Sequence, residues 1–294
     1  MFIFITIFLS TQLFYISRPS LEDIRRLLPR VQRECRRWLA FWDRILLRAQ
    51  SEPKFLFQLD KTHIFIISLV RTPERKQTTL TSLEVQQIQY TVHDAVDGLK
   101  DLDKQSLSIY AGIKKRRRLS ISKSWSYERL LAFLADYEAH NLRDPTTRIA
   151  LHERLRFGCF MSHIELWQRI GRMKLRFAVI LEDDVILVEN FIEKLELLLQ
   201  ELPQSWDLLY LNGSFKKFGP RFSSHLALSR GGVGAFGYVI SERAIPKLLS
   251  ASTKSNKAID HVMDEEVLSG RVLSFHAFEP LVLLQKEVRS TLAY

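Results

Sequence analysis

The chain has 294 residues, enough for one large domain or two modest ones with a sizeable core. Hydrophobic residues make up 46% and charged residues 26%, which excludes a disordered or collagen-like chain. A polytopic membrane protein is also excluded, because only about the first 17 residues form a long uncharged apolar run. The two cysteines, Cys35 and Cys159, are too few for a disulfide framework or a four-cysteine zinc site.

The net charge of +10 is unevenly distributed along the chain. Residues 21–56 carry a balance of +4 and residues 100–156 a balance of +6, whereas residues 157–294 hold 16 basic and 16 acidic residues. Such basic segments attract anionic partners, namely lipid headgroups, lipopolysaccharide phosphates, nucleic acid or nucleotides. A solvated basic face without a partner is the alternative.

The apolar segment Met1–Ser17 is short for a membrane span, which needs about 20 residues. It lacks the basic start and the cleavage site of a secretory signal. Arginines follow from Arg18, so if the segment inserts, the positive-inside rule places the rest of the chain in the cytoplasm. A start codon assigned too far upstream would produce the same stretch. We expect a cytoplasmic protein, either peripheral to a membrane or anchored to it by this segment.

Residues 21–50 have apolar positions at intervals of three and four, which predicts an amphipathic helix. Arginines fill much of its other face, and a basic helix with Trp38 and Trp42 suits a membrane surface. A helix packed on the main domain is the alternative. We therefore expect an N-terminal segment over residues 1–56 and a main domain over residues 57–294.

The main domain begins with a strand–helix–strand pattern. His63–Val70 is a continuous apolar run, which predicts a buried parallel strand. Thr72 offers a capping hydroxyl and Pro73 suits a first helical position, so that residues 73–85 are predicted as a helix. Gln89–His93 is the second strand. This order points to an α/β fold with a parallel sheet.

The alternation resumes after a basic stretch, residues 99–156, that we interpret as an insertion. Helices are predicted near 127–140 and over Ser162–Arg172, Phe191–Leu202 and Ser241–Leu249. Strands are predicted over Phe177–Leu181, Trp206–Leu211 and Ala235–Ile240, with a glycine loop at 231–234.

Three consecutive carboxylates, Glu182, Asp183 and Asp184, interrupt an apolar strand. Because burying them uncompensated would be very costly, we place them at the carboxyl end of that strand, where ligands bind in open α/β sheets. A divalent cation would relieve their repulsion and could also grip a diphosphate, and hard oxygen ligands favour Mg²⁺ or Mn²⁺. The alternative is an acidic turn that opens the next helix.

Other catalytic patterns fit less well. His163-Ile164-Glu165 resembles a fragment of the zinc-deaminase motif, but the chain has no Cys-x-x-Cys. On its own, His163 is more often a satisfied helix histidine than a catalytic one. The glycine loop lacks the Walker ending, and no Gly-x-Ser-x-Gly elbow occurs.

Several motifs in order resemble those of the family 25 glycosyltransferases, which include bacterial lipooligosaccharide galactosyltransferases and collagen galactosyltransferases. The resemblance runs from about Ile64 to Leu284 and is poor in the basic insertion. Its motifs are Ile66–Arg75 with Ser68 in place of the usual Asn, Ala95–Gly98, Gly158–His163 followed by Trp167, Leu181–Asp184, Gly237–Ser241 with Ala244, Asp260, and Pro280–Val282.

The resemblance implies a GT-A fold, that is, a Rossmann-type, mostly parallel sheet flanked by helices. It also implies a UDP-sugar donor, a divalent metal that is usually Mn²⁺, and transfer with inversion. UDP-galactose is the commonest donor in the family and UDP-glucose is a rival. In a single displacement, a base takes the proton of the acceptor hydroxyl while the metal and nearby cations stabilise the leaving diphosphate.

Site residues carry over by position. Asp184 and Asp183 are the implied metal contacts, and Glu182 or Asp183 is a contact to the donor ribose. Arg71 and Arg75 are the implied diphosphate contacts. Ser162 and His163 are implied to line the donor or acceptor pocket, with Ser162 as a donor contact and His163 as a catalytic residue. Asp260 is the first choice for the base or a second metal contact, and its rivals are His261, Asp264 and His276.

Our leading hypothesis is a hexosyltransferase that extends a lipooligosaccharide, lipopolysaccharide or related surface glycan. In it, the basic insertion binds an anionic acceptor or docks at a membrane. The alternative is a non-catalytic basic module on a degenerate transferase scaffold, which the run Lys114–Arg118 favours. Aromatic residues are sparse near that run, so we expect no nucleic-acid partner. The intact acidic triplet also argues against degeneration.

Overall fold

The computed structural model describes residues 21–56, 63–98, 145–212, 216–253, 255 and 257–285. The chain divides into two compact units, residues 1–52 and residues 53–294. The apolar segment Met1–Ser17, the basic run Lys114–Arg118 and the helix predicted near 127–140 lie outside the described residues. Within the described part of the chain, every helix is too short or too polar to cross a membrane.

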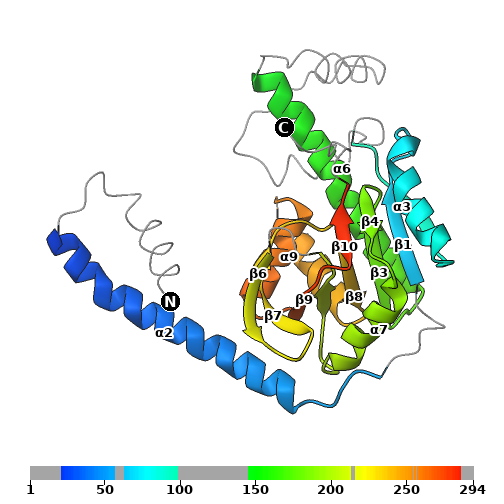
Figure 1. Cartoon of the computed structure of the whole chain (residues 1–294). Helices are drawn as coiled ribbons and strands as arrows, with labels where there is room; N and C mark the ends of the chain where they lie inside the picture. The colour runs from blue at the N-terminus through cyan, green and yellow to red at the C-terminus, as the bar shows by residue number, and fades with distance from the viewer. Residues whose placement is uncertain are drawn as a thin grey trace. The chain divides into compact units, whose positions relative to one another are not determined.

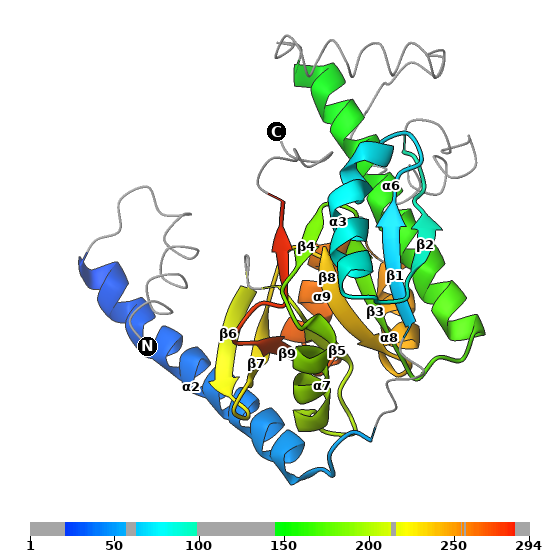
Figure 2. The ribbon, with the colours of Figure 1, turned by 45° about the vertical axis from the view of Figure 1, so that its right-hand side comes forward.

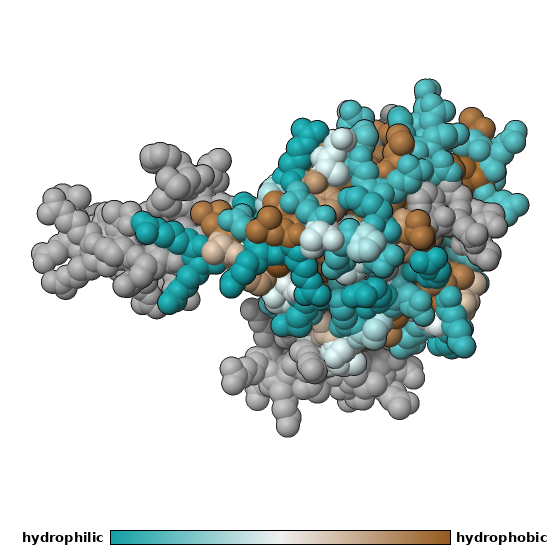
Figure 3. Space-filling model, turned by 90° about the horizontal axis from the view of Figure 1, so that it is seen from below, coloured by the Kyte–Doolittle hydropathy of each residue, from teal (hydrophilic) through white to brown (hydrophobic). Residues whose placement is uncertain are grey.

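The first unit contributes the helix α2 (Leu21–Ser51), which confirms the helix predicted over residues 21–50. The ring of Trp42 packs edge-on against Trp38 and Phe41 on the same helix. The exposed side chains of its second half include Arg36, Arg37, Arg44 and Arg48 together with Leu39 and Leu47. Seen from below, the described surface of the molecule is mostly hydrophilic, with its apolar residues in small groups (Figure 3).

The second unit is built on an eight-stranded sheet with the strand order β2-β1-β3-β8-β5-β9-β7-β6 (Figure 1). The strands are β1 (His63–Ser68), β2 (Thr91–Asp94), β3 (Phe177–Glu182), β5 (Leu208–Tyr210), β6 (Lys216–Arg221), β7 (Leu226–Gly232), β8 (Gly237–Ser241) and β9 (Ser274–Ala277). Strand β1 pairs in parallel with β2 and β3, and β5 with β9. Only β8 and β7 run antiparallel to their neighbours within this sheet. The predicted α/β architecture with a mostly parallel sheet is confirmed.

A smaller sheet pairs β4 (Val185–Leu187) with β10 (Val282–Leu284) in antiparallel register. It brings the last described residues next to the acidic triplet, since the backbone N–H of Gln285 donates to the carbonyl of Asp184 at 2.9 Å. The last motif of the family resemblance, Pro280–Val282, overlaps β10 only at Val282, and the sequence analysis missed β4, which is three residues long.

Helices cover both faces of the large sheet. The helices α6 (Pro145–Arg172), α8 (Ala244–Ser252) and α9 (Ile259–Leu268) contact one another on one face, and α3 (Pro73–Val85) and α7 (Phe191–Glu201) lie on the other (Figure 2). This double cover explains the continuous apolar strands, because a strand buried on both faces has no polar side. Residues 178–181 of β3 are completely buried.

Two predicted helix starts are wrong. Helix α6 begins at Pro145, well before the predicted Ser162, because Pro145 suits a first turn and the glycine at 158 is tolerated inside the helix. The other helix was predicted from Ser241, which instead ends β8 and donates its hydroxyl to the carbonyl of Trp206 at 3.0 Å. Helix α8 then begins at Ala244 without a side-chain cap.

Two smaller expectations are also corrected. The hydroxyl of Thr72 makes no capping hydrogen bond to α3, although the helix does begin at Pro73 as predicted. The glycine loop predicted at 231–234 is half strand, because β7 continues to Gly232.

Gly158 allows α6 to approach the turn that follows β2. A Cβ atom at this position would lie 2.7 Å from the backbone nitrogen of Gly98 and 2.7 Å from the carbonyl oxygen of Val96, closer than packed atoms allow. One turn later, the hydroxyl of Ser162 accepts a hydrogen bond from the N–H of Val96 at 2.9 Å and donates to the carbonyl of Gly158 at 2.7 Å. Gly158 and Ser162 therefore fix the helix on the Ala95–Gly98 turn.

We expect Gly158→Ala to lower the free energy of unfolding by about 1–3 kcal/mol, because the added methyl group forces the helix and the turn apart. Gly171→Ala on the same helix is the matched control, since its Cβ would lie at an ordinary 3.6 Å from Ile245. The control should be neutral or up to about 1 kcal/mol more stable, as alanine is the better helix former. Urea unfolding compares the two variants, and equal stabilities would contradict the close approach.

Candidate active site

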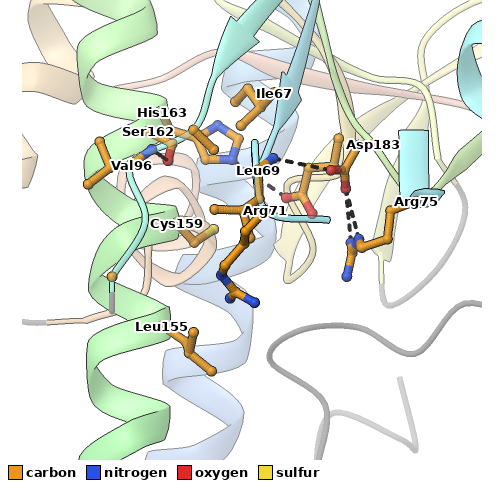
Figure 4. A pocket seen from close by; sticks show the side chains of 13 residues that line it. Ile67, Leu69, Arg71, Arg75, Val96, Leu155, Cys159, Ser162, His163 and Asp183 are labelled. Carbon is orange, nitrogen blue, oxygen red and sulfur yellow. Dashed lines mark hydrogen bonds and ion pairs between the residues drawn. The ribbon is translucent and has the colours of Figure 1, made fainter. Parts of the chain in front are cut away.

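The acidic triplet lies at the carboxyl end of β3. Glu182 ends the strand and is partly exposed, whereas Asp183 and Asp184 begin the turn toward β4 and are only 4% and 5% exposed. A pocket opens beside them, lined by residues of β1, the turn after β2, α6 and the end of β3 (Figure 4). The triplet therefore stands at the edge of the sheet where the sequence placed it.

Arg75 on α3 binds both buried aspartates. Its Nε and Nη2 atoms each lie 3.0 Å from Oδ1 of Asp183, and Nη2 also lies 2.9 Å from Oδ2 of Asp184. The second oxygen of Asp183 accepts a hydrogen bond from the N–H of Leu69 at 3.3 Å (Figure 4). Both carboxylate oxygens of Asp183 thus have protein partners, and the guanidinium offsets part of the charge of the triplet.

Asp184 retains one buried carboxylate oxygen, Oδ1, with no hydrogen-bond partner among the described residues. Burial and, after it, the charge of Glu182 raise the pKa of Asp184, and Arg75 opposes them, so that the pKa stands at about 7. A cation at this oxygen would satisfy the lone pair and relieve the repulsion. Asp184 and the partly exposed Glu182 supply hard oxygen donors, so these residues fit a Mg²⁺ or Mn²⁺ ion.

Thr79 holds the turn that carries the triplet. Its hydroxyl lies 2.7 Å from the carbonyl of Val185 and 3.0 Å from that of Asp183, and it accepts a hydrogen bond from the N–H of Val185 at 3.2 Å. The side-chain amide of Gln285 donates to the same hydroxyl at 3.2 Å. Sequence reasoning missed Thr79 and Gln285, because neither belongs to a recognisable motif.

Arg71, the other predicted diphosphate contact, lies on the pocket wall. Its Nε atom is 2.9 Å from Oδ2 of Asp97, so the ion pair joins the loop after β1 to the turn after β2. Ser162, predicted beside the donor, is completely buried and holds that same turn. All three residues thus have internal partners, and the side chain of Arg71, at 15% exposed, is somewhat more open than that of Arg75 at 9%.

His163 links α6 to the triplet. Its Nδ1 atom is 2.9 Å from the hydroxyl of Tyr238 on β8, which also accepts a hydrogen bond from Nε1 of Trp167 at 2.8 Å. Its Nε2 atom lies 3.5 Å from Oε1 of Glu182. The imidazole is completely buried, and it therefore reaches Glu182 from a fixed orientation. Tyr238 lies in the Gly237–Ser241 motif of the resemblance, but the sequence analysis gave it no role at the site.

Asp260, the predicted base, stands in the first turn of α9. Its Oδ2 accepts a hydrogen bond from the N–H of Gly234 at 3.0 Å, and its Oδ1 accepts one from the N–H of His261 at 2.8 Å. Burial raises the pKa of the Cys159 thiol, and the charges of Glu182, Asp260 and Asp184 raise it further. Asp260 and two members of the triplet therefore act electrostatically on the same thiol, although they lie far apart in the sequence.

The rivals of Asp260 lie in different surroundings. His261 is exposed, and Asp264 accepts a hydrogen bond at 2.6 Å from the N–H of Gly232. His276 is completely buried, with its Nε2 atom 2.8 Å from the hydroxyl of Ser229 and its ring stacked on Tyr210 at 4.9 Å. We assign His276 to the core of the sheet.

Comparison with known proteins identifies the family. Residues 61–263 match the family model described as "Glycosyltransferase family 25 (LPS biosynthesis protein)". The chain belongs to glycosyltransferase family 25. Its acidic triplet, its Ala95–Gly98 turn, its Gly158–His163 segment and Asp260 all lie within the matched residues, which confirms the resemblance seen in the sequence.

Relatives within family 25 include proteins named as inactive and proteins named as galactosyltransferases. Mouse "inactive glycosyltransferase 25 family member 3" is 31% identical over 54% of this chain and 23% of its own length. Mouse procollagen galactosyltransferase 2 is 28% identical over 54% of this chain and 22% of its own length. The human protein of that name is 27% identical over 68% of this chain and 29% of its own length. This family 25 chain therefore spans less than a third of the length of these relatives.

A solved structure, that of mouse xyloside xylosyltransferase 1 in its apo form, covers 72% of this chain and 84% of its own. The TM-score is 0.37 and the identity is 9%. The assignment to family 25 therefore rests on the sequence match over residues 61–263.

The pKa of Asp184 predicts how stability depends on pH. In metal-free buffer, the unfolding free energy of the wild type should fall relative to that of Asp184→Asn as the pH rises from about 4 to about 7. In this range the unfolded carboxyl has already lost its proton near 3.8, whereas the folded carboxyl keeps its proton until about 7. Urea unfolding of both proteins in EDTA measures the difference, and a difference independent of pH would contradict the buried, charge-crowded site.

Proposed function

We propose that this family 25 member transfers a hexose, with galactose as the first choice, from a UDP-sugar to a glycan acceptor. The acceptor belongs to lipooligosaccharide, lipopolysaccharide or a related surface glycan, and the transfer inverts the anomeric centre. The observation that supports this proposal is the intact triplet beside a pocket, with the buried Oδ1 of Asp184 lacking a partner among the described residues.

In this proposal, Asp184 and Glu182 hold a Mn²⁺ or Mg²⁺ ion. The bound metal would supply the positive charge that stabilises the departing diphosphate. Arg75 fixes Asp183 and Asp184, and its charge limits the repulsion within the triplet. Arg71 on the pocket wall adds a guanidinium suited to phosphate oxygens. Asp183 then acts chiefly through its hydrogen bonds to Arg75 and Leu69, rather than as a direct metal ligand.

Asp260 is the proposed general base. It would remove the proton of the acceptor hydroxyl as the oxygen attacks the anomeric carbon of the donor sugar. The two backbone N–H groups that bind its carboxylate fix its direction at the start of α9. The bond to the diphosphate breaks on the opposite side of that carbon, which accounts for inversion.

We expect Asp184→Ala to reduce Mn²⁺-dependent turnover of UDP-sugar by about a hundredfold or more, to the level of wild type in EDTA. Glu189→Ala, which removes an exposed carboxylate five residues later, is the matched control and should keep full activity.

In the same assay Asp260→Asn should lower kcat and leave the KM for the donor unchanged. Urea unfolding verifies that each variant folds, and equal activity of wild type and Asp184→Ala would refute the proposal.

A second candidate is a family 25 scaffold that binds its donor without turnover. Two observations favour it: several relatives are named inactive, and Arg75 already compensates part of the acidic charge. Thermal unfolding with UDP-galactose or UDP-glucose, each with Mn²⁺, separates the candidates, because a ligand of the native state raises the melting temperature. A raised melting temperature, together with neither hydrolysis of the UDP-sugar nor transfer of its sugar to an acceptor, would favour this second candidate.

We also propose that α2 places the protein at the cytoplasmic face of an anionic membrane. A helix with exposed arginines beside exposed leucines suits a lipid interface. In co-sedimentation with phosphatidylserine vesicles, the double variant Arg36→Glu/Arg44→Glu should bind several-fold less than wild type. Neither protein should bind neutral vesicles. Arg172→Glu/Arg243→Glu, with the same change of charge in the second unit, is the control. Equal loss in both double variants would contradict a specific role of α2.

A further inference from the structure

A second group of metal-ligating side chains lies on the α6 wall of the pocket. Cys159 and His163 are four residues apart on α6, so both project from the same side of the helix. Glu182 faces them from the end of β3. One ligand atom of each residue, the thiol sulfur, an imidazole nitrogen and a carboxylate oxygen, lies within 4.8 Å of the other two. Figure 4 shows Cys159 and His163 directed from the helix toward the pocket.

The imidazole of His163 is already arranged as a metal ligand. Its Nε2 atom is buried and has no hydrogen-bond partner among the described residues, although Oε1 of Glu182 is 3.5 Å away. Its other nitrogen, Nδ1, is held at 2.9 Å by the hydroxyl of Tyr238, which Trp167 holds in turn. Histidine ligands in proteins keep such a bond on the second nitrogen, because it fixes the tautomer and the ring orientation. An unsatisfied buried nitrogen is otherwise costly.

We propose that Cys159, His163 and Glu182 bind one Zn²⁺ ion, with the fourth coordination position open to the pocket. A thiolate, an imidazole and a carboxylate form a ligand set typical of zinc, with bond lengths of about 2.0–2.3 Å. The ligand atoms are close enough for side-chain rotations to bring them to these distances. Three protein ligands and an open fourth position are the pattern of exchangeable zinc sites rather than closed structural ones.

Charge also favours a dication at this position. The zinc ion displaces the thiol proton of Cys159 to the solvent, so that one thiolate and one carboxylate balance its two charges. The charges of Asp260 and Asp184 act on the same thiol and add to the attraction for a cation. The soft sulfur distinguishes this site from the hard oxygen site at Asp184, which suits Mn²⁺ or Mg²⁺. The zinc site does not depend on the transferase proposal.

The test is titration of the full, metal-free, reduced chain with Co²⁺, which serves as a spectroscopic substitute for zinc. Wild type should show a thiolate-to-cobalt charge-transfer band in the near ultraviolet, which one equivalent of Zn²⁺ abolishes. Cys159→Ser should lack the band and bind Zn²⁺ at least about tenfold more weakly. Cys35→Ser is the matched control, because Cys35 is the only other cysteine in the sequence, and it should retain the band.

Two more variants keep the test decisive. Glu182→Gln, which changes a partly exposed side chain, should retain the charge-transfer band but weaken Zn²⁺ binding. Asp184→Asn should retain both the band and the Zn²⁺ affinity, even if it loses Mn²⁺-dependent turnover. The zinc site and the transferase proposal can therefore fail independently of each other. The absence of the band in wild type, or its loss in Cys35→Ser instead of Cys159→Ser, would overturn the zinc site.

Discussion

The ion pair between Arg75 and the two buried aspartates is the interaction on which the site depends. Three carboxylates at the end of an apolar strand repel one another, and burial adds to the cost of their charge. Arg75 joins Asp183 and Asp184 through a single guanidinium, which ties α3 to the turn after β3. Removing one partner of a buried pair typically costs about 3–5 kcal/mol, so this contact constrains fold and site together. It leaves Oδ1 of Asp184 buried and without a hydrogen-bond partner among the described residues.

The opposite wall of the pocket is set by close packing. Gly158 lets α6 touch the turn after β2, and Ser162 bonds that turn. As a result, the ring of His163 lies beside Glu182, and a hydrogen bond to Tyr238 fixes its orientation. The family segment from Gly158 to His163 thus combines residues that position the helix with residues that face the ligand. The two metal sites that we propose, one at Asp184 and one at Cys159 and His163, would both include Glu182.

The parts of the fold that could be predicted are those that a short stretch of sequence determines by itself. Residues 63–68 and 177–182 form apolar runs long enough to identify buried strands, and Pro73 marks the start of α3. The start of α6 could not be predicted, because the preceding basic stretch has no clear period and a glycine interrupts the helical pattern. Contacts between residues far apart in the sequence could not be predicted either. Arg75 was predicted to bind a diphosphate, and only the structure shows that it pairs with the triplet.

Direct titration of the metal-free protein with Mn²⁺, followed by the electron paramagnetic resonance signal of the unbound ion, measures the property on which the transferase account rests. Wild type should remove one equivalent of Mn²⁺ from solution, and Asp184→Asn should bind it at least about tenfold more weakly while its urea unfolding remains cooperative. Equal Mn²⁺ binding by the two proteins, or no binding by wild type in the presence of a UDP-sugar, would contradict a metal-dependent site at the end of β3.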